Sequence, residues 1–370
     1  MNRELKKAYT EERLSAREAQ SKAEFIAWAP AVFQASRLLL KYGILDMLRN
    51  NADGLTRTEI AQRTGLSDYA VKCLMEAALT IGTVLMTADT ADTPNPNYTM
   101  SKTGWFLLND PATRVNIDFN HDVNYEGWFR LDESLREGRP AGLEHFGPWP
   151  TVYEGLSQLP EQVRQSWLAF DHFYSDSSFP EALEIVFRKH HTRTLYDVGG
   201  NTGKWALQCV GFDDAVRVTI LDLPGQIAMM RKNTEGAKGA DRISGHAINL
   251  LDDNAPFPKS TEGPDAIWMS QFLDCFSMPQ IVSILKRARE AMTATTHLYI
   301  METLWDRQRF EPAAFCLTMT SLYFTAIANG NSKMYDTHDM QKCINEAGLR
   351  IEETHDNLGQ GHSILVCTIS

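Results

Sequence analysis

The chain has 370 residues, of which 43% are hydrophobic, so it is long enough to form two domains with packed cores. Its net charge of −11 at pH 7 argues against broad nucleic-acid binding, which needs a basic surface. No apolar run approaches the roughly 20 residues that span a membrane, and the charged N-terminus lacks the apolar segment of a signal peptide. The six cysteines form no C-x-x-C pair. We therefore expect reduced thiols, a cytoplasmic location and no membrane association.

The N-terminal third is predicted to be a helical, winged-helix domain. Residues 27–48 carry apolar side chains at helical spacing, with a break or cap at Gly43. Residues 55–79 read as a helix-turn-helix in which Gly65 makes the turn. The following segment, 81–108, has the pattern of a two-stranded wing.

A winged helix can read DNA, but the charge of this one argues against that role. Its second helix, within 67–79, contains two acids and one basic residue, Lys72. DNA-reading helices use arginine, lysine, asparagine or glutamine at these positions. The long apolar helix that precedes it would expose much surface in a monomer, so we expect a dimerisation module and a homodimer. A winged-helix repressor is the alternative, which a salt-dependent DNA shift assay would test.

Residues 115–190 are predicted to be aromatic-rich helices that connect two domains. The stretch FDHFYSD, residues 170–176, concentrates aromatic and polar side chains immediately before a glycine-rich segment. A histidine among aromatic residues is most often a hydrogen-bonded packing residue. Its place in the chain nevertheless makes His172, with Phe173 and Tyr174, a candidate for lining a substrate pocket.

The glycine-rich segment LYDVGGNTGKWAL, residues 195–207, lies between two apolar runs and is typical of a nucleotide-binding turn. A P-loop requires serine or threonine after Gly-Lys, and Trp205 stands there instead. The dinucleotide fingerprint G-x-G-x-x-G requires glycine where Val198 stands. Both templates therefore fail, and an NAD-dependent oxidoreductase is disfavoured.

A third template fits this loop better. The acidic-x-G-x-G-x-G turn of proteins that bind S-adenosylmethionine (SAM) is matched by Asp197, Gly199 and Gly203, with Asn201 at the middle glycine position. Asparagine is among the few residues that accept a positive φ, so the turn can form. The alternative is an ordinary strand-to-helix turn without a ligand.

The C-terminal half alternates apolar strands with helices and ends in a hairpin, which predicts a mostly parallel, doubly wound Rossmann-like sheet with an antiparallel edge. Asp222 ends the second predicted strand, 19 residues after Gly203, where a carboxylate can accept both hydroxyls of a ribose. NAD and SAM share this feature. The seven predicted strands lie within 194–198, 216–224, 246–252, 264–276, 293–304, 349–356 and 362–370.

Five segments in this order, DVGGNTG, ILDLP, DAIWMSQFLDCFS, REAM and YIMET, resemble the SAM-dependent O-methyltransferase family. Its members are two-domain enzymes of plant phenolic and bacterial polyketide pathways, with an N-terminal winged-helix dimerisation domain. The resemblance covers nearly the whole chain. It implies a dimerisation domain over 1–115, connecting helices that form part of the substrate pocket over 116–190, and an α/β methyltransferase domain with a seven-stranded sheet over 191–370.

The resemblance also assigns cofactor contacts. Gly199 and its loop would meet the methionine part of SAM, and Asp222 would bind the ribose. Asn249 and Leu250 would flank the adenine. The remaining implied contacts are Asp197, Gly200, Asn201, Gly203, Leu223, Ser270 and Gln271.

The catalytic pattern departs from the family at one position. The family places a histidine base after the fourth strand, and ungapped alignment puts Asp274 there, while the supporting glutamate is present as Glu302. A free aspartate is a poor base for a phenol, although burial raises its pKa. Asp274 is therefore a desolvated base, a residue that orients His172 as the base, or a helix cap in an enzyme that relies on positioning alone.

In the family the helix corresponding to 313–331 walls the acceptor pocket, which makes Met319 and Tyr323 candidates for contact with a flat aromatic or polyene acceptor. No metal site is expected, because His190 and His191 lack acidic partners at ligand spacing.

The sequence therefore predicts a homodimeric SAM-dependent methyltransferase of secondary metabolism that acts on a small organic acceptor. Transfer to a hydroxyl oxygen of an aromatic or polyketide-like compound is favoured. The alternatives are carbon or nitrogen methylation, and a catalytically inactive SAM-binding regulatory protein.

Overall fold

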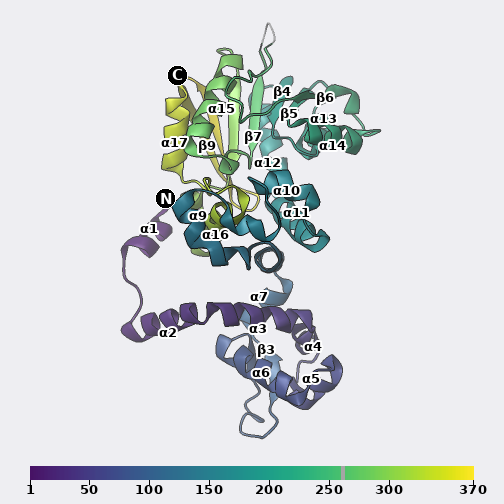
Figure 1. Cartoon of the computed structure of the whole chain (residues 1–370), viewed down its shortest axis with the longest axis vertical. Helices are drawn as coiled ribbons and strands as arrows, with labels where there is room; N and C mark the ends of the chain where they lie inside the picture. The colour runs from purple at the N-terminus through teal and green to yellow at the C-terminus, as the bar shows by residue number, and fades with distance from the viewer. Residues whose placement is uncertain (260–262) are drawn as a thin grey trace. The chain divides into compact units, whose positions relative to one another are not determined.

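The computed structural model describes residues 1–259 and 263–370 and divides into two compact units (Figure 1). One unit is Glu12–Asp122. The other combines Met1–Glu11 with Val123–Ser370. In the part of the chain that the structure describes, no helix is long and apolar enough to cross a bilayer.

The Glu12–Asp122 unit is a winged helix, as the sequence predicted. Gly43 adopts φ +67° between two helices, and Gly65 adopts φ +72° in the helix-turn-helix. The wing forms from two antiparallel strands, and a short strand that the sequence did not indicate pairs with it. The elements are α2 (Ala16–Ala27), α3 (Ala29–Lys41), α4 (Ile44–Arg49), β1 (Leu55–Thr56), α5 (Arg57–Thr64), α6 (Asp68–Ile81), β2 (Val84–Met86), β3 (Asn97–Met100), α7 (Lys102–Asn109) and α8 (Pro111–Phe119).

The core of this unit forms between α3, α4, α5 and α6. Leu39, Ile44, Ile60, Val71 and Met75 are fully buried there. Val71 and Met75 lie four residues apart on α6, the spacing of one helix face, which is why this helix could be predicted.

The larger unit is built on a sheet with seven strands among the described residues, in the order β6-β5-β4-β7-β8-β10-β9. All neighbours are parallel except β10, which runs antiparallel to β8 and β9. The order reverses between β4 and β7, and ligands of open α/β sheets bind at such a switch point. The strands are β4 (Thr194–Val198), β5 (Arg217–Asp222), β6 (Ile243–Ala247), β7 (Ala266–Ser270), β8 (His297–Glu302), β9 (Leu349–Leu358) and β10 (His362–Ile369).

All seven predicted strands are present, but the prediction for the third was displaced. Strand β6 ends at Ala247, whereas the sequence placed the strand at 246–252. The apolar Ile248 and Leu250 of that stretch are buried in the core beyond the strand end. The predicted strand was displaced because these apolar residues are buried without being paired in the sheet.

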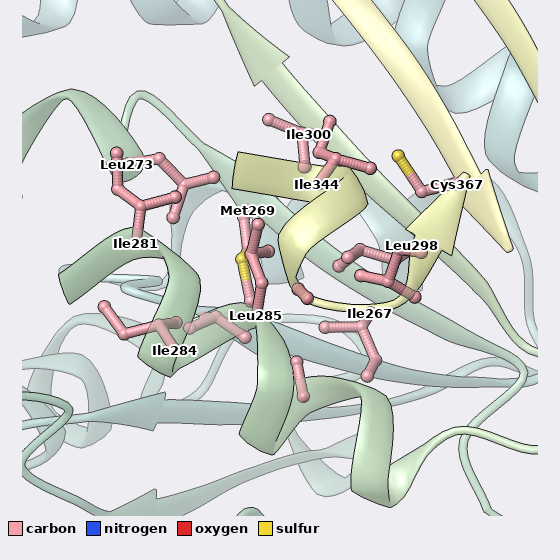
Figure 2. Packing of buried hydrophobic residues seen from close by; sticks show 14 of the residues in the cluster. Ile267, Met269, Leu273, Ile281, Ile284, Leu285, Leu298, Ile300, Ile344 and Cys367 are labelled. Carbon is pink, nitrogen blue, oxygen red and sulfur yellow. The ribbon is translucent and has the colours of Figure 1, made fainter. Parts of the chain in front are cut away.

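Helices cover both faces of the sheet (Figure 1). Along β7, Ile267 and Met269 point to the face packed by α15 and α17 (Figure 2), while Ala266 and Trp268 belong to the core cluster on the other face. This alternation follows from the period of two in a strand. The helices after β4 are α13 (Lys204–Phe212), α14 (Pro224–Thr234), η7 (Ala240–Arg242), η8 (Leu273–Cys275), α15 (Met278–Ala291), η9 (Trp305–Arg307), α16 (Glu311–Tyr323), η10 (Phe324–Ala328) and α17 (Thr337–Glu346).

Short helices precede the sheet in the chain, and the first of them is N-terminal. Its Leu5 is buried, and the Asn2 side chain donates a hydrogen bond of 2.6 Å to the backbone oxygen of Gln308. These elements are α1 (Arg3–Thr10), η1 (Asn120–Asn124), η2 (Gly127–Arg130), α9 (Leu131–Glu137), η3 (Ala141–His145), α10 (Val152–Gly155), η4 (Leu156–Gln158), α11 (Glu161–Ser175), η5 (Asp176–Ser178), α12 (Phe179–Leu183) and η6 (Glu184–Lys189).

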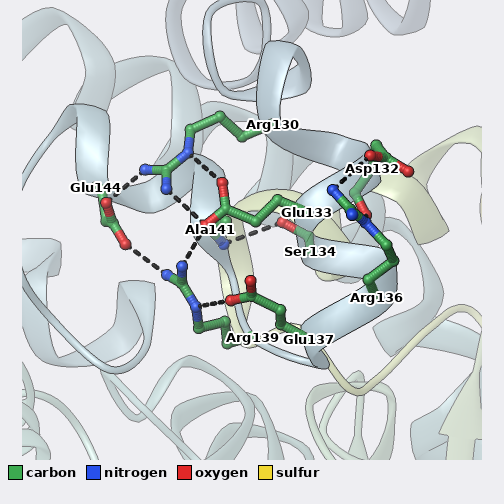
Figure 3. A network of polar contacts seen from close by, with 9 residues as sticks. All are labelled: Arg130, Asp132, Glu133, Ser134, Arg136, Glu137, Arg139, Ala141 and Glu144. Carbon is green, nitrogen blue, oxygen red and sulfur yellow. Dashed lines mark hydrogen bonds and ion pairs between the residues drawn. The ribbon is translucent and has the colours of Figure 1, made fainter.

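A network of ion pairs joins three of these short elements. Arg130 on η2 and Arg139, which follows α9, both pair with Glu133 and with Glu144 on η3, and Arg139 also pairs with Glu137 (Figure 3). Exposed ion pairs contribute little individually. Because each arginine bridges several carboxylates, the network fixes the orientation of these elements more than it adds stability.

Candidate functional site

The glycine-rich loop between β4 and α13 has the backbone shape that its sequence predicted. Gly199, Asn201 and Gly203 adopt φ values of +73°, +48° and +81°. At Gly200 an added Cβ would lie 2.5 Å from the carboxylate Oδ2 of Asp197. A side chain at that position would therefore displace either the loop or Asp197, so the close approach of the loop to β4 requires glycine there.

Asp222 at the end of β5 is coupled to this loop. Its Oδ2 accepts the backbone N–H of Asn201 at 2.9 Å, and its Oδ1 accepts that of Leu223 at 2.7 Å. Burial raises the pKa of Asp222, and these two hydrogen bonds oppose the rise. The carboxylate thus links the tip of the loop to the end of the neighbouring strand, and each oxygen retains a lone pair for a hydroxyl donor.

Asp197 at the end of β4 is only 2% exposed, and its Oδ2 has no hydrogen-bond partner among the described residues. Burial and the nearby carboxylate of Asp222 raise the pKa of Asp197 to about 8. A buried carboxyl oxygen without a donor is costly. The side-chain Oε1 of Gln271, which adopts φ +43°, is likewise buried without a described partner. These two buried oxygen atoms and the adjacent glycine-rich loop fit a ligand that brings hydrogen-bond donors, as the aminoacyl and ribose groups of SAM do.

A cavity of about 110 Å³ lies against the loop. Its walls include 197–202 of the loop, Ser270 and Gln271 after β7, and Asp171 with His172 from α11. The structure therefore brings the predicted cofactor residues of β4 and β7 together with His172. A second, open cavity of about 680 Å³ is lined by 246–249 and 255–259, and this is where Asn249 lies.

Asp274 occupies the turn η8 immediately after β7 and is only 5% exposed. Its Oδ1 accepts a hydrogen bond of 3.5 Å from the thiol of Cys275. Burial raises the pKa of Asp274 to about 7, with a further rise from Asp171, while the Cys275 hydrogen bond opposes the rise. A carboxylate with this pKa can take up a proton at neutral pH, which an exposed aspartate cannot.

Glu302 at the end of β8 holds the turn that carries Asp274. Its Oε1 accepts the backbone N–H groups of Phe272 at 3.1 Å and Leu273 at 2.8 Å. Glu302 is 3% exposed, and burial, with the charge of Asp274, raises its pKa well above the usual range. This geometry suits a positioning residue, because the side chain accepts two consecutive backbone N–H groups of the turn that leads to Asp274.

The other predicted pocket residues divide into buried and exposed ones. Tyr323 on α16 is buried, and its hydroxyl accepts a hydrogen bond of 2.7 Å from the indole N–H of Trp167. Phe173 and Tyr174 are partly buried on α11. Met319 on α16 is 42% exposed. Among the cofactor candidates, Leu223 and Asn249 are exposed, whereas Leu250 is buried.

Two residues near Asp274 were not assigned from the sequence. Asp171 lines the cavity, and burial raises its pKa. Tyr153 on α10 is hydrogen-bonded to Cys275 and interacts with Asp274. Asp171 has a signal in the sequence, because Trp167, Asp171 and Tyr174 recur at intervals of four and three and so share one helix face. Tyr153 has none, since its position depends on tertiary packing.

This sheet order, with a glycine-rich loop and an acidic residue at the ends of neighbouring strands, defines the class of SAM-dependent methyltransferases. Residues 20–91 match the model of the Dimerisation2-like domain, and residues 162–350, just over half of the chain, match that of the O-methyltransferase domain. The chain therefore belongs to the O-methyltransferase family and is a SAM-dependent methyltransferase of small molecules.

The chain is similar to several characterised proteins. It is 22% identical to the L-tyrosine C(3)-methyltransferase of Streptomyces lavendulae, over 89% of this chain and 87% of that one. It is 23% identical to the 3-amino-4-hydroxybenzoate 4-O-methyltransferase of Streptomyces cremeus, over 86% and 82% of the two chains. Its structure resembles that of the SAM-dependent methyltransferase SibL with a TM-score of 0.70 and 22% identity, over 94% of this chain and 99% of that one. This structural likeness bears on the fold alone.

Proposed function

We propose that the protein transfers the methyl group of SAM to the hydroxyl oxygen of a small aromatic acceptor, with Asp274 as the general base. The observation that carries this proposal is the buried carboxylate of Asp274, whose pKa of about 7 suits proton uptake at neutral pH. Asp274 lies in the short helix η8 that follows β7, four residues after Ser270 of the cofactor cavity.

The residues divide the work between binding and proton transfer. Asp222 receives the ribose hydroxyls, the backbone of 199–203 receives the aminoacyl part of the cofactor, and Glu302 holds the turn of Asp274. When bound, SAM supplies an electrophilic methyl group on a sulfonium. Asp274 would take the hydroxyl proton of the acceptor when the methyl group is transferred to that oxygen. Alignment of the acceptor oxygen with the methyl group would supply much of the acceleration.

Carbon methylation is the second candidate, and one observation favours it. The relative from Streptomyces lavendulae is named a C(3)-methyltransferase of L-tyrosine. Removal of a phenol proton by Asp274 also makes the adjacent ring carbon nucleophilic, so one base serves both outcomes. The position of the acceptor relative to the methyl group would then decide which atom is methylated.

The test is turnover of a panel of simple phenols with SAM, followed by S-adenosylhomocysteine release and by NMR of the product. Product with a methoxy signal supports oxygen transfer, and a ring-methyl signal supports carbon transfer. If the protein binds S-adenosylhomocysteine but methylates no phenol, the proposal fails and a regulatory SAM-binding protein is favoured.

We also propose that the protein acts as a homodimer. Phe25, Ile26 and Trp28 of the Glu12–Asp122 unit are 51%, 64% and 66% exposed, and this segment lies within the Dimerisation2-like match. Large apolar side chains grouped in sequence on one helical segment favour a partner surface. Light scattering at micromolar concentration should give twice the monomer mass of 41.7 kDa. A monomer would refute the dimer.

A further inference from the structure

The residues that line the cofactor cavity include hydrogen-bond donors as well as acceptors. The lining of this cavity of about 110 Å³ includes the start of α13, where Lys204 and Trp205 directly follow the glycine-rich loop. Pockets that hold a whole small molecule usually have volumes of roughly 300–1,000 Å³. The cavity therefore suits one end of the cofactor, and the loop beside it is the part that the proposed function assigns to the aminoacyl end.

Trp205 brings a buried donor to this cavity. The residue is 4% exposed, and its indole Nε1 has no hydrogen-bond partner among the described residues. Its ring stacks on Trp268, which also lines the cavity, with 4.3 Å between the ring centroids. An indole N–H can only donate, and a buried donor without an acceptor is costly. A ligand that places an oxygen atom at this N–H would remove that cost.

Lys204 adds a positive charge next to Trp205. It is the first residue of α13, and the N-terminus of a helix favours a negative group. Its ammonium lies 3.0 Å from Oδ2 of Asp176, but the two side chains are 46% and 45% exposed. Exposed ion pairs contribute little stability, and an ammonium group has several N–H donors. Lys204 can therefore receive a second anion at little cost.

The buried acceptors complete the pattern. Asp197 and Gln271 each have a buried side-chain oxygen without a partner among the described residues, and both line the same cavity. The methionine end of SAM is a zwitterion, whose ammonium group needs acceptors and whose carboxylate needs donors. We propose that Lys204 and the indole N–H of Trp205 receive the carboxylate of SAM, while the ammonium group donates to Asp197 and Gln271. The inference rests on the cofactor placement in the proposed function and involves neither the methyl acceptor nor its base.

An acceptor such as a hydroxybenzoic acid would bring the same chemical group. Two observations favour the cofactor as its source. Lys204 and Trp205 are contiguous with the loop 199–203, and the cavity that they line is too small for an aromatic acid beside the end of the cofactor. The experiment tests both sources.

The test compares S-adenosylhomocysteine with its decarboxylated analogue, which keeps the amine and lacks the carboxylate, by calorimetry on the full-length protein. The wild type should bind S-adenosylhomocysteine at least about tenfold more tightly, because charge-assisted hydrogen bonds are lost with the carboxylate. In Lys204→Gln this preference should fall to about threefold or less through weaker binding of S-adenosylhomocysteine, with the analogue bound as before. Lys204→Arg keeps the charge and should keep the preference. Trp205→Phe keeps an aromatic ring, removes the donor and should reduce the preference about threefold.

Controls separate the carboxylate contact from the ion pair and from the methyl acceptor. Asp176→Asn breaks the same ion pair but leaves the ammonium of Lys204, so this variant should keep the preference. Lys232→Gln, at an exposed position on α14, should change neither affinity. The protein saturated with S-adenosylhomocysteine should bind 4-hydroxybenzoate with the same affinity in the wild type and in Lys204→Gln.

Equal affinities of the wild type for S-adenosylhomocysteine and its analogue would overturn the inference. An equal loss of both ligands in Lys204→Gln would also overturn it, because the substitution would then act on the loop. Weaker binding of 4-hydroxybenzoate alone in Lys204→Gln would assign the lysine to the methyl acceptor instead. A protein that binds neither nucleoside refutes the cofactor placement in the proposed function. Binding without methylation of any phenol refutes only the transfer reaction and leaves this inference to be decided by the affinities.

Discussion

Replacing Asp274 with asparagine should have opposite effects on activity and on stability. Asp274 is 5% exposed, and its pKa is about 7 in the folded protein, against about 3.9 in an unfolded chain. A carboxyl group whose pKa is raised by folding contributes stability that is fully present below the unfolded pKa. That contribution is lost as the pH rises through the folded pKa. The ionised wild type therefore carries a penalty that the neutral asparagine avoids.

The size of that penalty follows from the difference between the two pKa values. At a pH of about 8 it amounts to roughly 4 kcal/mol as an upper figure, at about 1.4 kcal/mol for each pKa unit. Asp274→Asn should therefore raise the free energy of unfolding in alkaline buffer by up to this amount and have little effect at a pH of about 4. Asp171 and Glu302 interact with Asp274, so the difference between variant and wild type includes the change that the substitution causes in the pKa values of these two neighbours.

The same variant should lose activity. Removing a general base costs about 10²–10⁴-fold in kcat, and the rise of kcat/KM with pH near 7 that the wild type should show would be absent. Denaturant unfolding at several pH values and initial rates on one phenol supply the two measurements. The control is Asp132→Asn, an exposed carboxylate on α9 that should change neither. A variant that is less stable than the wild type in alkaline buffer, or one with unchanged turnover, would refute the assignment.

Three substitutions test the cofactor loop, each by calorimetry with S-adenosylhomocysteine and by denaturant unfolding. Gly200→Ala places a Cβ 2.5 Å from Asp197 and should weaken S-adenosylhomocysteine binding at least about tenfold. Its control is Gly211→Ala in α13, where an added Cβ has no neighbour within 4 Å. This control should leave binding unchanged and add about 0.5–1 kcal/mol to the free energy of unfolding. Equal affinities of these two variants would contradict the geometry. Asp222→Asn should weaken binding about 10–100-fold, because a charged acceptor of the ribose is lost, and unchanged affinity would exclude that role. Asn201→Gly keeps the positive φ and should bind as the wild type does, so weaker binding would indicate a contact from the asparagine side chain.

The parts of the fold that were predictable from the sequence are those that local chemistry determines. The positive φ of Asn201 follows from its place in a turn that otherwise needs glycine. The parallel strands β4, β5 and β7 are short and largely buried, so their apolar runs located them in the sequence. The predicted position of strand β6 was wrong because strand pairing ends at Ala247, whereas buried apolar residues continue beyond it. Hydrophobicity indicates burial, but it does not indicate strand pairing.

The parts that were not predictable depend on contacts between distant segments. Nothing in the sequence of α1 distinguishes it from the helices that follow. Yet Asn2 bonds to the backbone of Gln308, 306 positions away, and α1 groups with the larger unit. The proximity of Asp171 to Asp274 likewise requires that α11 pack near the end of β7. Local sequence patterns cannot predict such contacts between segments that are far apart in the chain.

The surroundings of Asp274 give a physical reason why an aspartate can stand where the family has a histidine. A histidine base is neutral before it takes a proton, whereas Asp274 must be ionised beside Asp171 and Glu302, which disfavour its charge. Burial and the charge of Asp171 bring the pKa of Asp274 to about 7, close to the range in which a free histidine titrates. In these surroundings the aspartate can therefore accept and release a proton at neutral pH, as a histidine base would.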